Sequence, residues 1–159
     1  MYYSDTIITP IGKLHVTVSE KGVSRICFPG EHRGVREVRM PKHHLVLRSK
    51  RELKEYFLGK RKKFTLPLTM DGTVFQKNVW RALRTVPYGE TVSYFEQARK
   101  VGKKNAVRAV GSANGRNPIP IIVPCHRVIA MSGGLGGYSG GLAIKKKLLA
   151  LEQKFSRKT

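Results

Sequence analysis

The chain has 159 residues, enough for one average domain or two small lobes, and can bury a core without disulfides or metals. Lys and Arg number 31 against 10 acidic residues, and this formal net charge of +21 favours a polyanionic partner over a merely soluble surface. No apolar run approaches the roughly 18 residues of a membrane span. No long basic amphipathic stretch with an aromatic face occurs either, so nucleic acid is favoured over a membrane.

The first residues, Met1 to Asp5, have neither the basic nor the apolar region of a signal peptide. Cys27 and Cys125 lie far apart and lack the spacing of metal ligands. Both features predict a reducing, intracellular compartment in which a thiolate survives. That compartment would be the cytoplasm, in association with the nucleoid, or the nucleus of a eukaryote.

The first half of the chain predicts a small lobe of mixed structure. Residues 14–18 and 23–28 alternate as strands do, and Ser19 to Gly22 between them favours a hairpin turn. Residues 30–44 resemble a solvated loop. Residues 45–58 predict a helix that Gly59 ends. Cys27 ends a strand pattern and is interpreted as a packed residue.

A shift in composition at residues 69–72 predicts a boundary between an N-terminal lobe, 1–70, and a C-terminal domain, 71–159. The second part opens with an apolar helical stripe. Its members are Phe75, Val79, Leu83 and Val86. The short segments 94–99 and 105–115 then predict a helix-turn-helix across residues 101–104.

The apolar run Ile119 to Val123 predicts a buried strand that ends at Cys125. A last helix is expected over residues 142–155, with Lys145, Lys146 and Lys147 on its basic side. Together these elements predict an α/β (α+β) fold. A small mixed sheet–helix lobe precedes a mainly helical domain with a helix-turn-helix and a short active-site strand.

The segment 105–115 has one apolar and one small polar face. The apolar face consists of Ala106, Val110 and Ala113, and the opposite face of Asn105, Arg108, Ser112 and Gly115. A helix with small exposed residues can approach a nucleic-acid groove closely. Arg108 is then the side chain long enough to enter a base stack, although an arginine in such a position is often only a surface residue.

Cys125 stands in the run Pro124-Cys125-His126-Arg127-Val128, before a glycine-rich loop. A thiol of ordinary pKa, about 8.5, is only a few per cent thiolate at pH 7, so reactivity requires a base whose own proton is managed by a third group. His126 could be that base, through a bridging water or a bend, because adjacent side chains of a strand point to opposite faces. Glu152 is the acid we expect to orient His126, although spacing alone does not single it out.

Residues 75–152 closely resemble the O6-alkylguanine-DNA alkyltransferases, also called methylated-DNA–protein-cysteine methyltransferases. The segments that carry the resemblance occur in the family's order and spacing. They are residues 86–94, 106–111, Asn117-Pro118, 124–128 and 136–141. The first half resembles the family's variable lobe only loosely.

The resemblance implies a DNA-repair protein without a cofactor. Such a protein would bind double-stranded DNA that carries alkylated bases through the minor groove, flip the damaged nucleotide out and take its alkyl group on Cys125 once and irreversibly. The substrate would be O6-alkylguanine, with O4-alkylthymine left open. We expect no membrane partner and a monomer, with cooperative binding along DNA also left open.

Further roles follow from the resemblance position by position. Arg108 matches the arginine that fills the vacated stack, and Tyr94 the tyrosine that crowds the flipped nucleotide's phosphate and protonates the departing guanine. Asn117 matches the asparagine that braces the turn after the recognition helix, and Ser112 lies on the DNA-facing side. The activating relay would comprise His126 and Glu152. The substrate pocket would comprise Val128, Tyr138, Ser139 and Asn114.

Two positions depart from the family. Some members bind zinc in the N-terminal lobe, but Cys27, His32, His43 and His44 do not match those ligand positions, so no metal site is expected. At Asn114-Gly115 some relatives carry bulkier residues, so the resemblance does not predict how wide the pocket is.

Three alternatives compete with the alkyltransferase interpretation. A non-enzymatic lesion-binding relative would lack the acceptor that Cys125 supplies. A helix-turn-helix regulator would need base-reading side chains that residues 105–115 lack. A Cys-His hydrolase would need an oxyanion hole and would turn over many times.

Overall fold

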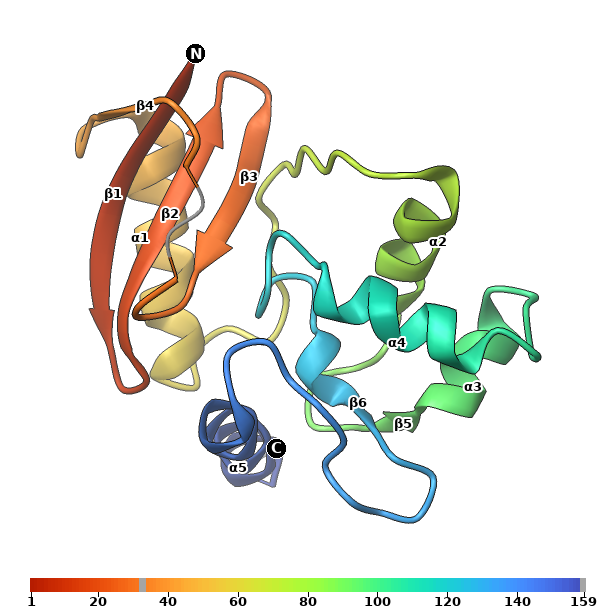
Figure 1. Ribbon diagram of the computed structural model, residues 1–159. Coiled ribbons are helices and arrows are strands. Elements are labelled where there is room, and N and C mark those ends of the chain that lie inside the picture. The colour runs from red at the N-terminus through yellow and green to blue at the C-terminus, as the bar shows by residue number, and fades with distance from the viewer. Residues whose placement is uncertain (32–33, 158–159) are drawn as a thin grey trace. The chain divides into compact units, whose positions relative to one another are not determined.

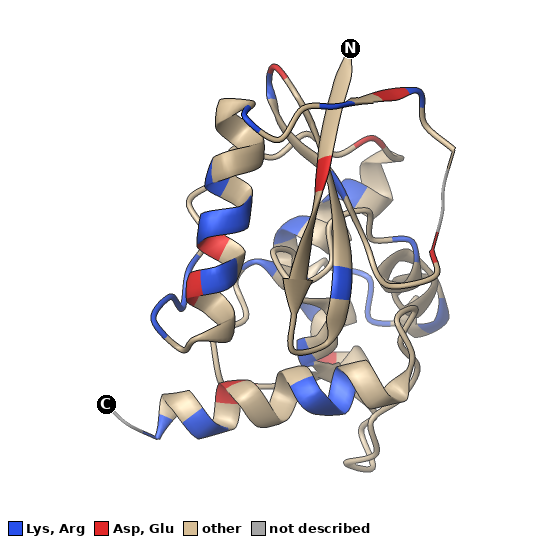
Figure 2. Cartoon of the chain, turned by 90° about the vertical axis from the view of Figure 1, so that its left-hand side faces the viewer, with Lys and Arg blue, Asp and Glu red and all other residues tan. Residues whose placement is uncertain are grey.

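The computed structural model describes residues 1–31 and 34–157, and the chain divides into two compact units, residues 1–70 and 71–159 (Figure 1). His32 therefore lies outside the described residues. Among the helices described, none combines the length and the apolar character needed to cross a membrane. Figure 2 shows Lys and Arg along α1 (His44–Phe57) and along the C-terminal helix α5 (Leu142–Ser156).

The first unit is a four-stranded sheet packed against α1. Its strands are β1 (Tyr2–Thr9), β2 (Gly12–Ser19), β3 (Gly22–Cys27) and β4 (Glu37–Arg39). They lie in the order β3-β2-β1-β4, with β4 parallel to β1 and the other pairs antiparallel. The predicted hairpin is confirmed as β2 and β3, and the predicted helix as α1.

Strand β1 has no counterpart among the predictions because its fully buried positions are polar. Ser4 and Asp5 are buried, and the Asp5 carboxylate pairs with Lys50 of α1 at 2.7 Å and with Arg39 at 3.2 Å. Those cations lower the pKa of Asp5 against the opposing effect of its burial. A strand held partly by charge pairing lacks the apolar alternation by which strands are recognised.

The second unit contains the helices of the predicted helix-turn-helix. Its helices are α2 (Val74–Leu83), α3 (Tyr94–Lys100), α4 (Val107–Gly115) and α5. Thr73 and Gln76 form a reciprocal capping box at the start of α2. Trp80 of α2 is buried and donates from Nε1 to the Ala113 carbonyl of α4 at 2.8 Å, which holds α4 against α2.

The strand predicted over Ile119–Val123 is not formed, and this prediction is wrong. Pro120 and the flanking prolines remove backbone donors that a strand would need, and Ile121 has a positive φ of 75°. The chain continues as a 3₁₀ turn, η1 (Cys125–Arg127), and only then as the short strand β6 (Val128–Ile129), parallel to β5 (Val92–Ser93).

Candidate active site

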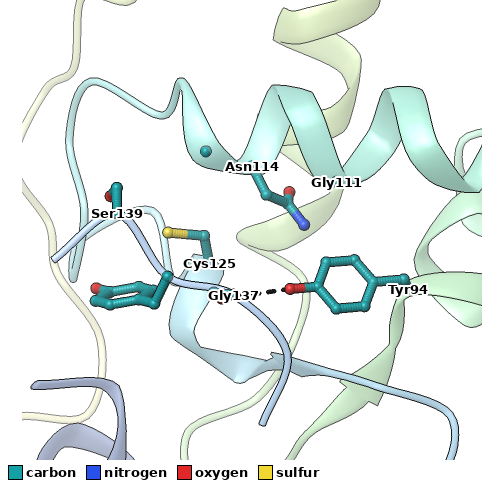
Figure 3. Close-up of a pocket in the computed structure, with 8 residues that line it drawn as sticks. Tyr94, Gly111, Asn114, Cys125, Gly137 and Ser139 are labelled. Carbon is teal, nitrogen blue, oxygen red and sulfur yellow. Dashed lines mark hydrogen bonds between the residues drawn. The ribbon is translucent and has the colours of Figure 1, made fainter. Parts of the chain in front are cut away.

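Cys125 opens onto a cavity of about 330 Å³ in the second unit (Figure 3). Helices α3 and α4 and the loop before α5 supply its walls. The lining residues are Tyr94, Gly111, Asn114, Gly115, Cys125, Gly137, Tyr138 and Ser139. Five residues predicted for catalysis or for the pocket therefore surround one space. Cavities of this size are typical of small-molecule sites.

The turn η1 changes the geometry expected around the thiol. Cys125 and His126 are both buried and adjacent on a 3₁₀ turn, so the expectation that their side chains point to opposite faces of a strand does not apply. Burial raises the pKa of the Cys125 thiol to about 11. Hydrogen bonding by the Asn117 and Tyr138 side chains and the positive charge of Lys145 oppose that rise only in part. The resting residue is therefore a thiol.

Behind the thiol, Glu152 of α5 lies 2.6 Å from Nε2 of His126. A carboxylate only accepts hydrogen bonds, so Nε2 donates, and the lone pair of a neutral imidazole is then on Nδ1. This Nδ1 is buried and has no hydrogen-bond partner among the described residues. Burial lowers the pKa of His126 below its ordinary 6.5, in spite of the carboxylate. His126 is thus a neutral base with an available nitrogen.

The Glu152 carboxylate is also held by groups other than His126. Arg127 donates from Nε at 2.8 Å and from Nη2 at 3.1 Å, and the Gly89 backbone N–H donates at 3.1 Å. Arg127 in turn donates from Nη1 to the Val86 carbonyl at 2.8 Å. Burial raises the pKa of Glu152, but hydrogen bonds from His126 and Arg127 and the positive charge of Arg127 outweigh it and keep that pKa far below its ordinary value. The 86–89 segment thereby positions the acid.

Tyr94, the first residue of α3, forms the opposite wall. Its hydroxyl donates to the Gly137 carbonyl at 3.4 Å (Figure 3). Burial raises the pKa of Tyr94, so the phenol keeps its proton. Gly136 packs against the ring with a φ of +69°, and a Cβ there would lie 2.9 Å from the tyrosine hydroxyl. The loop glycine is required by both its backbone conformation and this close approach.

Asn117 joins the end of α4 to the thiol segment. Its Nδ2 donates to the Val123 carbonyl at 2.7 Å and its Oδ1 accepts from the Ile119 N–H at 2.9 Å. Arg108 and Ser112 do not line the cavity and lie exposed on α4. Val110 and Ala113 are buried on the opposite side of that helix, as the sequence pattern predicts.

Lys145 is the largest departure from the sequence analysis, because it does not belong to the solvated basic face of α5. The residue is fully buried, and its ammonium group donates to three backbone carbonyls, those of Val128 at 2.6 Å, Gly137 at 3.1 Å and Leu135. All three N–H groups of the ammonium are therefore used. Its Nζ lies 5.9 Å and 6.0 Å from the ring centroids of Tyr94 and Tyr138.

The sequence analysis did not predict that Lys145, Arg127 and Gln97 are buried at or near the site. For Lys145, the sequence contains one indication of this. On α5 the buried residues are Lys145, Leu148 and Glu152, which have the spacing of one helical face. A helix that directs Glu152 toward the site therefore directs Lys145, seven residues earlier, to the same side. Arg127 and Gln97 carry no comparable signal, since their burial depends on partners distant in sequence.

In the first unit, the residues considered for zinc have other contacts. Cys27 is buried at the end of β3, and His43 accepts a hydrogen bond from the Leu45 N–H at 3.2 Å at the start of α1. His44 stacks on His43 with ring centroids 4.6 Å apart. Within residues 1–31 and 34–157, no group of three or more His, Cys, Asp and Glu side chains is arranged to hold a metal ion.

Two family descriptions match nearly the whole chain. Residues 1–70 match the ribonuclease-like domain of 6-O-methylguanine DNA methyltransferase, and residues 74–154 match its DNA-binding domain. The chain therefore belongs to the 6-O-methylguanine DNA methyltransferase family. It is an enzyme of the class that transfers an alkyl group from DNA to a cysteine of the protein.

Individual relatives agree with this assignment. The methylated-DNA–protein-cysteine methyltransferase of Methanosarcina barkeri is 46% identical over 158 residues, which cover 96% of this chain and 98% of the relative. The constitutive enzyme of that name from Bacillus subtilis is 43% identical over 159 residues, covering 96% of each. The crystal structure of Mycobacterium tuberculosis OGT in complex with DNA has a TM-score of 0.90 and 42% identity, covering 97% of this chain and 93% of that chain.

Proposed function

We propose that this protein repairs O6-alkylguanine in double-stranded DNA by flipping the damaged nucleotide out of the duplex and transferring the alkyl group to Cys125. The transfer is irreversible, so each molecule acts once. The observation that carries the proposal is a buried thiol that opens onto a base-sized cavity and is backed by a buried His126–Glu152 pair.

The first step is activation of the thiol. Nδ1 of His126 takes the Cys125 proton through a bridging water, while Nε2 stays hydrogen-bonded to Glu152. The carboxylate stabilises the imidazolium that forms. Lys145, whose charge favours the thiolate, offsets part of the cost of creating an anion in a buried site.

The second step is in-line attack of the sulfur on the saturated carbon attached to O6. The S–C bond forms as the C–O bond breaks, and the electron pair of the broken bond leaves with guanine. Tyr94 donates its proton to the departing base and is reprotonated by the proton that His126 took from Cys125, so that no proton is gained or lost overall. The product is a thioether, which has no good leaving group, so the thiol is not regenerated.

Delivery of the base depends on α4 and on charge. Arg108 is exposed on a face whose other members are small, which supports its role as the side chain that fills the vacated stack. The helix enters the minor groove, and the net charge of +21 supplies affinity for the phosphates without reading sequence. Flipping costs a few kcal/mol, and less for a mispaired alkylguanine. We further propose that the protein acts as a monomer in the compartment that holds the DNA, which is the cytoplasm of a prokaryote or the nucleus of a eukaryote.

The test is incubation with O6-benzylguanine followed by intact-mass measurement of the wild type and of Cys125→Ala. The expected result is one benzyl adduct on the wild type, mapped to Cys125, and none on the variant. Cys27 is the internal control, since it is buried in the other unit. Multiple turnover, or an unmodified wild type, would overturn the proposal and favour the hydrolase or the lesion-binding alternative.

A second test separates base delivery from chemistry. Arg108→Ala is expected to slow repair of alkylated duplex DNA by far more than it slows reaction with the free base, because only the duplex requires flipping. Lys154→Ala, at an exposed cation on α5, is the matched control for a simple loss of charge. Equal losses on both substrates would show that Arg108 does not act in flipping.

A further inference from the structure

A buried pair of amides connects the two helices of the helix-turn-helix. Nε2 of Gln97 on α3 donates to Oδ1 of Asn114 on α4 at 2.8 Å, and Nδ2 of Asn114 donates to Oε1 of Gln97 at 2.7 Å. Gln97 is 1% exposed and Asn114 is 6% exposed. The pair therefore holds the plane of the Asn114 amide against α3.

The pair leaves Asn114 with unused hydrogen-bonding capacity. A primary amide has two N–H groups and an oxygen with two lone pairs, and the reciprocal pair uses one donor and one acceptor of each residue. Among the described residues, no further partner is observed for the Asn114 side chain. Asn114 lines the cavity, whereas Gln97 does not. Figure 3 shows the Asn114 amide projecting from α4 toward the space between Cys125 and Tyr94.

The chemistry of an alkylated purine fits such a donor. Alkylation at O6 removes the N1 proton of guanine, so the ring nitrogens N1, N3 and N7 are all acceptors. The other polar groups on the cavity wall are the Cys125 thiol and three hydroxyls, which belong to Tyr94, Tyr138 and Ser139. Among the described lining residues, Asn114 alone has a side-chain amide, and the second N–H of its Nδ2 is a donor at a buried position.

We propose that Asn114 determines base specificity by donating its second Nδ2–H to a ring nitrogen of the flipped O6-alkylguanine. Gln97 is a positioning residue that holds the plane of the Asn114 amide at the cavity wall. A buried donor discriminates strongly, because a base without the matching acceptor leaves the donor unpaired. With a base that has a C–H group at that position, the Asn114 N–H is left without an acceptor, and binding is weakened.

This inference rests on the proposed function and is tested with free bases, which do not require DNA binding. Single-turnover rates are measured with O6-benzylguanine and with its 1-deaza, 3-deaza and 7-deaza forms, each of which replaces one ring nitrogen by C–H. For the wild type, one deaza form is expected to react about 3- to 10-fold more slowly through loss of the Asn114 contact, the range of one neutral hydrogen bond.

The decisive variant is the double replacement Gln97→Met with Asn114→Leu. Removing both partners leaves no unpaired buried amide, so this variant is expected to fold. Its ratio of the two rates, with O6-benzylguanine and with the affected deaza base, is expected to be about 3- to 10-fold smaller than the wild-type ratio, because intrinsic differences between the two bases affect both proteins equally. Gln97→Met alone is expected to give an intermediate ratio, because Asn114 remains but can turn. Asn78→Leu, at an exposed amide on α2, is expected to keep the wild-type ratio.

The outcomes separate this inference from the function on which it rests. If the wild type takes a benzyl adduct at Cys125 but no deaza ratio changes in the double variant, the role of Asn114 is refuted and alkyl transfer stands. A deaza effect that persists in the double variant belongs to another donor, such as Tyr94, and also refutes it. A wild type without an adduct refutes both.

Discussion

The dependence of alkyl transfer on pH tests whether His126 is the base. Burial raises the pKa of Cys125 to about 11, so at pH 7 about one molecule in ten thousand holds a thiolate formed by simple ionisation. At pH 9 that fraction is about one in a hundred. A reaction that depended on simple ionisation would therefore accelerate about 100-fold between pH 7 and pH 9.

Proton transfer to His126 gives a different profile. The pair of neutral thiol and neutral imidazole carries the same total charge as the pair of thiolate and imidazolium, so their ratio does not depend on pH. Between the two pKa values the rate is then flat. Because burial lowers the pKa of His126 below 6.5, the rate is expected to fall only when the pH drops below that value. Between pH 7 and pH 9 we expect a change of less than about 3-fold.

The assay is rapid-quench formation of the benzyl adduct from O6-benzylguanine, followed by mass spectrometry from pH 5 to pH 10. The control is His126→Phe, which removes the base and is expected to restore a slope of about tenfold per pH unit. A wild-type rate that rises about 100-fold from pH 7 to pH 9 would refute general-base activation by His126.

Three further predictions follow from the packing around the cavity. Lys145→Met is expected to lower the free energy of unfolding, measured by urea titration, by roughly 2–4 kcal/mol, because charged hydrogen bonds to three carbonyls are lost. Lys146→Met, at an exposed position, should change it by less than about 0.5 kcal/mol. Gly136→Ala is expected to displace Tyr94 and to slow adduct formation at least about tenfold. Gly133 also has a positive φ, but a Cβ added there would have no atom within 4 Å, so Gly133→Ala should preserve the rate. Equal effects of the two substitutions would contradict the steric argument. Acid is expected to destabilise the fold, because the pKa values of the buried His126 and Glu152 are both lowered. The stability that these groups contribute is complete above pH 6.5 and is lost as the pH falls. Protonation of His126 removes the first part and protonation of Glu152 the second. A melting temperature that stays constant from pH 8 to pH 4 would show that neither group is coupled to folding.

Much of the fold could be predicted because its helices and its central hairpin have the apolar periodicity of their elements. The helices around residues 94–99 and 142–155 begin and end close to the predicted positions, at Tyr94–Lys100 and Leu142–Ser156. The strand β1 and the turn η1 could not be predicted by that rule. In β1 the buried residues are polar, and in the segment before η1 an apolar run is folded into turns by prolines.

The site divides in the same way. Cys125, His126 and the glycine-rich loop are adjacent in sequence, so their chemistry is visible in a short motif. The pairing of His126 with Glu152 joins residues that are 26 positions apart, and the Gln97–Asn114 pair joins residues 17 positions apart. Such pairs follow from the packing of helices, and spacing alone left Glu152 as one choice among several.

The sequence by itself determined which reactive groups are present, that the chain is strongly basic, and which family its motifs resemble. Only the tertiary structure decided the protonation states on which the chemistry depends. It places Cys125 out of water, which makes the thiol a weak acid, and it places the lone pair of His126 on Nδ1 by directing Nε2 to a carboxylate. It also buries Lys145, one of three consecutive lysines that composition cannot tell apart. The physical reason is that desolvation and hydrogen bonding depend on neighbours in space, which are brought together only when the helices pack.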